Sequence, residues 1–132
     1  MRFARWVFAI CGIYGIFALA PLYFMEERLG REYPPPISHP EFFYATIGVA
    51  LAWQVAFLFI SVDPVRLRPI MLTGVLEKLG YGVPAVILYF QGRSPSLTLL
   101  TGSSDLLMAV LFLGAYFQTA SRPAPSAAAS VS

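Results

Sequence analysis

Residues 70–90 read IMLTGVLEKLGYGVPAVILYF, an apolar run that carries an acid and a base, Glu77 and Lys78, near its middle. About 20 apolar residues in a helix cross the hydrocarbon core of a bilayer. A helix that began after the two charges would keep only residues 79–90, which rise roughly 18 Å against a core about 30 Å thick. We therefore expect the whole run to cross the membrane and to carry both charged side chains into it.

Three further apolar runs accompany this one along the chain. They predict spans over about residues 6–24, 42–62 and 97–117. The composition agrees, because a chain of 132 residues that is 58% hydrophobic and 12% charged has too little polar surface to coat a soluble globule. We expect an all-α fold, an integral membrane four-helix bundle of up-down-up-down order, in one transmembrane domain over residues 1–118.

The segments outside the spans differ in character. Arg2 and an apolar run ending in an A-x-A pattern are typical of a secretory signal, but Pro21 would then be the first mature residue, so we expect a retained span. The connection over residues 25–41 holds four prolines, which predict an extended strap without regular helix. Residues 119–132 hold Ser, Ala and Pro and no aromatic residue, which predicts a disordered tail.

Basic residues near the span ends predict the orientation. Five lie on the side of the two termini: Arg2, Arg5, Arg66, Arg68 and Arg122. Three lie on the opposite side: Arg28, Arg31 and Arg93. Because an excess of Lys and Arg marks cytoplasmic loops, we expect both termini to be cytoplasmic in a multi-pass protein of the cell (inner) membrane.

Polar residues of all four spans fall at similar depths. Counted from the cytoplasmic end of the span at about 1.5 Å per residue, Glu77 and Lys78 lie roughly 10 to 12 Å deep. The same count gives depths of roughly 12 to 18 Å for four more residues: Tyr14, Gln54, Tyr81 and Asp105. A charge at mid-membrane costs about 2.5 to 3.5 kcal/mol, so such groups normally face the bundle interior. These six residues are a candidate intramembrane polar site.

Two pairings are expected inside this layer, Lys78 with Asp105 and Glu77 with a tyrosine hydroxyl. A structural role is the alternative, in which the layer only fixes helix register. The long side chain of Lys78 would then snorkel toward the cytoplasm, with Glu77 following it or taking a proton. A polar stripe on the fourth span could instead be a path for water or a ligand: Thr98, Thr101, Gly102 and Asp105.

The span pattern as a whole also carries a family resemblance. With its long first connection, the basic turn after the second span and the run VLEKLGYG over residues 75–82, the chain resembles the small four-helix membrane proteins grouped with DoxX-like proteins. The resemblance covers about residues 6–117 and implies a four-helix bundle. The small multidrug transporters have a similar size, but their essential carboxylate lies in the first helix, where this chain has none. The emopamil-binding and sterol-isomerase bundles have a histidine and tryptophan pattern that His39 and Trp53 do not match.

Several classes of function lack their signatures. The single cysteine, Cys11, allows no intrachain disulfide, and the single histidine, His39, has no metal-ligand spacing around it. Phosphate cradles, nucleophile elbows and nucleotide fingerprints do not occur in the sequence. The formal charge of +2 is too small and too dispersed to indicate a nucleic-acid partner. We expect no cofactor and no metal.

Three functions remain open. The first, which the sequence favours, is a non-enzymatic accessory or scaffold subunit in the lipid bilayer, with a second copy or another membrane protein as partner. The second is a small bundle that binds or isomerises an apolar ligand such as a lipid, a sterol-like molecule or a quinone, with Glu77 and Asp105 handling protons. The third is a proton-coupled transport component. Only the second predicts a pocket lined by the candidate polar residues.

Overall fold

The computed structural model describes residues 2–120, and these residues form helices and loops without a strand. The elements in chain order are α1 (Arg2–Leu19), η1 (Ala20–Phe24), α2 (Glu26–Glu32), α3 (Pro40–Val62), α4 (Arg68–Phe90) and α5 (Ser96–Ala120). Four stretches are long and apolar enough to cross a membrane: α1 with η1, α3, α4 and α5. The predicted all-α class is therefore confirmed. Thr119 and Ala120, expected to begin the tail, belong to α5, and residues 121–132 lie outside the described residues.

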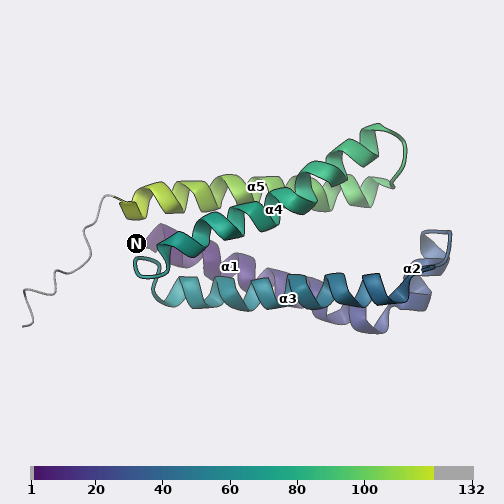
Figure 1. Ribbon diagram of the computed structural model, residues 1–132, viewed down its shortest axis with the longest axis horizontal. Helices are drawn as coiled ribbons and strands as arrows, with labels where there is room; N and C mark the ends of the chain where they lie inside the picture. The colour runs from purple at the N-terminus through teal and green to yellow at the C-terminus, as the bar shows by residue number, and fades with distance from the viewer. Residues whose placement is uncertain (1, 121–132) are drawn as a thin grey trace, which may run out of the picture.

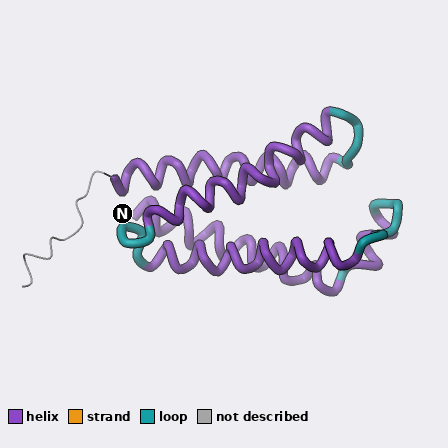
Figure 2. Tube along the Cα trace, in the orientation of Figure 1, coloured by secondary structure: helices purple, strands orange, loops and turns teal. Residues whose placement is uncertain are grey.

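The helices are arranged as two pairs (Figure 1). α1 packs along α3, and α4 packs along α5, while fewer contacts join one pair to the other. The beginning of α1, the α3–α4 connection and the end of α5 lie together at one end of the molecule, and α2 lies at the other (Figure 1). The two pairs meet at the first end and diverge toward the second (Figure 2).

An aromatic core joins the two pairs where they meet. It consists of Phe8 from α1, Phe57 from α3 and Phe112 from α5, and all three side chains are fully buried. The Phe8 and Phe112 rings stack with centroids 4.3 Å apart, and the Phe57 and Phe112 centroids lie 4.9 Å apart at 62°. Met71 of α4 is buried in the same cluster. Every long helix therefore contributes to this packed end of the bundle.

The first connection differs from the expected extended strap. Glu26–Glu32 form the helix α2, in which Glu26 and Glu27 occupy the first turn and Arg31 the last, a charge order that suits the helix dipole. Arg28 Nε also donates to Glu32 Oε1 at 2.8 Å, one turn along the helix. The expectation was wrong because proline acts locally, and the proline run begins only after α2 has ended.

Glycines allow α4 and α5 to approach closely. A Cβ built at Gly102 would lie 2.7 Å from the Cβ of Ala85, and a Cβ at Gly82 would lie 3.0 Å from the carbonyl oxygen of Gly102. The first distance is shorter than Cβ atoms show in real structures, and the second is tighter than most of their contacts. The absence of side chains at these two positions therefore sets the separation of the α4–α5 pair.

Gly102→Ala should lower the free energy of unfolding by about 1–3 kcal/mol, because the added methyl group meets Ala85 Cβ, which moves only with its backbone. Gly80→Ala on α4 is the matched control, since a Cβ built there has no described atom within 4 Å apart from its chain neighbours and the nearby backbone of its own helix. There the helix preference of alanine should raise the free energy of unfolding by about 0.5–1 kcal/mol. Denaturant titration of both variants in mixed micelles measures the two changes, and changes of the same sign would contradict the close approach.

Candidate functional site

A cavity of about 960 Å³ lies between the two helix pairs, on the diverging side of the aromatic core. Its walls come from all four long helices, with Leu22 of η1 and Leu29 of α2 contributing near the outer end, and most of the lining side chains are apolar. Ligand pockets commonly measure about 300–1,000 Å³. The lining includes all six residues of the candidate intramembrane polar site: Tyr14, Gln54, Glu77, Lys78, Tyr81 and Asp105.

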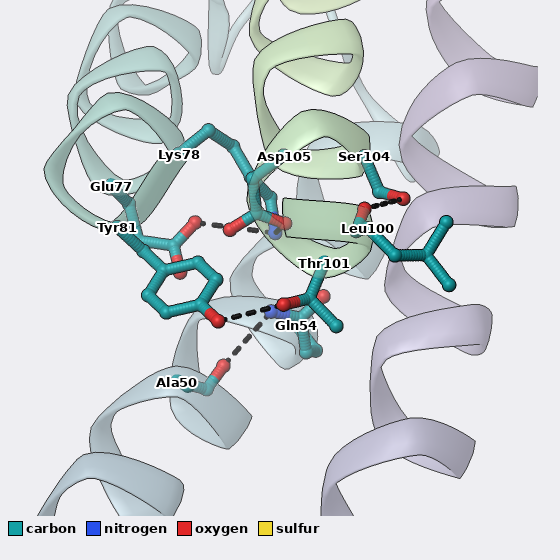
Figure 3. A network of polar contacts seen from close by, with 9 residues as sticks. All are labelled: Ala50, Gln54, Glu77, Lys78, Tyr81, Leu100, Thr101, Ser104 and Asp105. Carbon is teal, nitrogen blue, oxygen red and sulfur yellow. Dashed lines mark hydrogen bonds and ion pairs between the residues drawn. The ribbon is translucent and has the colours of Figure 1, made fainter. Parts of the chain in front are cut away.

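Lys78 lies at the centre of the polar groups (Figure 3). Its Nζ atom lies 3.5 Å from Asp105 Oδ1 on α5 and 3.5 Å from Glu77 Oε2 on its own helix. The same atom lies 5.4 Å from the centroid of the Phe57 ring. Only 4% of the Lys78 surface is exposed. The lysine therefore pairs inside the bundle with two carboxylates and does not snorkel toward the end of the bundle at which α1 begins, where the aromatic core is packed.

Glu77 and Tyr81 share a face of α4, but they do not bond to each other as expected. Tyr81 Oη lies 2.7 Å from Thr101 Oγ1 on α5 (Figure 3). Thr101 Oγ1 also lies 3.1 Å from the carbonyl oxygen of Leu97, which can only accept, so the threonine proton goes there and Tyr81 donates to Thr101. Glu77 Oε2 is buried and, within residues 2–120, accepts no hydrogen bond, although Lys78 stands at ion-pair distance.

Gln54 faces the cavity from α3 and is only 2% exposed. Its Nε2 donates to the carbonyl oxygen of Ala50 at 3.0 Å (Figure 3). Because that carbonyl oxygen only accepts, the bonded atom must be the amide nitrogen, and the other atom, Oε1, is an acceptor. Among the described residues no donor reaches Gln54 Oε1. A Cβ at Gly15 of α1 would collide with this oxygen, so the glycine provides the space that the amide occupies.

The fourth span contributes a different polar set from the one expected. Thr98, Thr101 and Asp105 line the cavity, but Gly102 packs against Ala85 on the other side of α5. Ser104 lines the cavity and was missed. It lies three residues after Thr101, a spacing that puts both on one helix face and could have identified it.

The described part of the site has few side chains that could act as ligands of a metal ion. Within residues 2–120 no group of three or more His, Cys, Asp or Glu side chains is placed to hold one. Glu77 and Asp105 already face the ammonium group of Lys78. The arrangement instead suits recognition of a polar group at the inner end of an apolar chamber.

The fold and the site define a class of molecule, a bundle of four helices of membrane-spanning length around a largely apolar cavity with charged residues at its inner end. Comparisons with protein-family models, with curated proteins and with solved structures found no match. The resemblance to DoxX-like proteins therefore stays a prediction.

Proposed function

We propose that the chain is a multi-pass protein of the cell inner membrane whose cavity binds an apolar small molecule with a polar end. The helices would run up-down-up-down with both termini cytoplasmic. The excess of arginine near the termini and the α3–α4 connection supports this orientation, because these segments lie at the same end of the molecule (Figure 1). The cavity would then lie on the extracytoplasmic side of the aromatic core.

The observation that carries the binding proposal is the cavity itself. A polar layer that served only to fix helix register would bring its side chains together in a packed interior. Here polar residues from four helices surround a space of about 960 Å³. The charged groups lie toward the aromatic core, and the walls beyond them are mostly apolar side chains such as Leu19, Leu29 and Phe43, with Thr46 and Thr98 among them. This distribution fits an amphiphile that enters with its polar end first.

A buried amide acceptor also supports binding over a scaffold role. Gln54 Oε1 is buried without a hydrogen bond from any described residue, whereas Glu77 Oε2 has the ammonium group of Lys78 at 3.5 Å. A buried acceptor without a donor costs about 1–3 kcal/mol. A ligand that donates to Gln54 Oε1 would remove that cost. The aromatic core packs the bundle beyond Lys78, and this packing supports binding over transport.

Ala50→Trp should abolish saturable ligand binding, because Ala50 lines the cavity one turn from Gln54 and an indole there would occupy the space. Ala52→Trp is the matched control, since Ala52 is exposed on the outer side of the same helix. The probes are four radiolabelled dodecyl compounds that differ only at the polar end: amine, alcohol, methyl ether and carboxylic acid. Equilibrium binding to the protein in phosphatidylcholine nanodiscs, with protein-free nanodiscs subtracted, gives the saturable part.

We expect saturable binding of at least one probe to the unmodified chain and to Ala52→Trp, and its loss in Ala50→Trp. Two results would overturn the proposal. One is the absence of saturable binding for all four probes. The other is equal saturable binding by the two tryptophan variants, which would place the bound probe outside the cavity.

A further inference from the structure

The geometry points to a protonated primary amine as the polar end of the ligand, an inference that rests on the proposed binding function. The bound molecule would be a cationic amphiphile, with its ammonium group among Gln54, Glu77 and Asp105 and its apolar chain along the walls beyond. The argument comes from charge, from hydrogen-bonding capacity and from the shape of the chamber.

The charges at the inner end of the cavity do not balance. Two carboxylates, Glu77 and Asp105, face one ammonium group, that of Lys78. Among the described residues that line the cavity, Lys78 is the only Lys or Arg. The ionised site therefore carries one unmatched negative charge in a chamber whose walls are apolar. Because an unmatched charge in such surroundings is costly, a cation is the ligand charge that the site stabilises.

Acceptors outnumber donors at the same place. Gln54 Oε1 accepts no hydrogen bond from a described residue, and Glu77 Oε2 has the Lys78 ammonium group at ion-pair distance but accepts no hydrogen bond from it. Lys78 already directs its ammonium group at the two carboxylates. A primary ammonium group brings three donors and no acceptor, whereas a hydroxyl brings one donor. A carboxylate brings no donor and adds a second negative charge. Donor count and charge thus select the same head group.

Aromatic side chains in the cavity lining also favour a cationic head group. Tyr14 of α1 and Tyr81 of α4 line the cavity, and both are exposed in part. The face of an aromatic ring attracts a cation that lies within about 6 Å of it. The hydroxyl of Tyr81 donates its hydrogen bond to Thr101 and not to Glu77 or Asp105. The ammonium group of a ligand therefore does not compete with Tyr81 for the two carboxylates.

The same four dodecyl probes test the head group separately from the binding function. In nanodiscs the amine should bind at least about tenfold more tightly than the alcohol, and the carboxylic acid should bind most weakly. If the alcohol, the ether or the acid binds saturably and as tightly as the amine, the ammonium inference is wrong while the binding function stands. If no probe binds saturably, the binding function itself fails.

Glu77→Gln should reduce the preference for amine over alcohol to within about threefold, since the variant removes the unmatched negative charge. Affinity for the methyl ether should stay unchanged, which shows that the folded cavity persists. Glu41→Gln is the matched control, because this carboxylate is exposed at the beginning of α3 and away from the cavity. An undiminished amine preference in Glu77→Gln would overturn the inference, as would an equal loss in Glu41→Gln.

Discussion

Lys78→Met should lower the free energy of unfolding by about 2–4 kcal/mol, because it leaves two carboxylates, whose side chains are only 16% and 19% exposed, without their cation. Methionine keeps an unbranched side chain of similar reach, so the variant mainly removes the ammonium group. Glu77 and Asp105 then have to remain charged without a partner or take up protons. Denaturant unfolding in mixed micelles, followed by circular dichroism, measures the loss.

A triple variant separates charge from packing at this position. When Glu77→Gln and Asp105→Asn accompany Lys78→Met, no unmatched charge remains, and most of the lost stability should return. This follows because breaking an ion pair leaves a buried charge, whereas replacing all of its members does not. A triple variant as unstable as Lys78→Met would show that the unmatched carboxylate charge is not what destabilises the single variant.

Phe112→Ala should cost about 3–5 kcal/mol of unfolding free energy, because it empties the centre of the aromatic core. The ring is 0% exposed, stacks on Phe8 and meets Phe57 edge-on. A Cβ at Gly74 of α4 would lie 3.5 Å from the same ring, so α4 also packs against it. The substitution therefore weakens contacts with three other helices at the point where the two pairs meet.

Phe117→Ala is the control for this prediction. Phe117 lies on the same helix but is 66% exposed, so lipid replaces the contacts that the ring loses. We expect a change well below that of Phe112→Ala, measured by the same unfolding titration. Equal losses for the two variants would mean that the aromatic core does not hold the pairs together.

The helices follow from local properties of the chain. Hydropathy alone placed apolar runs at about 6–24, 42–62, 70–90 and 97–117, and the long helices cover those runs. The prolines Pro40 and Pro69 lie in the first turns of α3 and α4, where a missing N–H is tolerated. The exception is α2. The prolines that follow it predicted no regular helix in this connection, but they affect only the residues next to them, and α2 ends before they begin.

The sequence predicted members of the cavity lining but not their contacts. The rise of about 1.5 Å per residue predicts similar depths for six polar residues, and all six line the cavity. Depth along a helix does not tell which neighbour a side chain faces. For this reason the sequence did not predict that Tyr81 bonds to Thr101 and not to Glu77, or that Gly102 faces Ala85 and not the cavity.

The sequence by itself determined the number of long apolar helices, because that number depends on hydropathy and on the regular rise of a helix, and it predicted six of the polar residues that line the cavity. Only the tertiary structure decided that the two helix pairs meet at the aromatic core and diverge beyond it. The physical reason is that lateral positions depend on contacts between helices, such as Gly15 against Gln54 and Gly102 against Ala85. Those contacts leave the polar layer lining an open chamber.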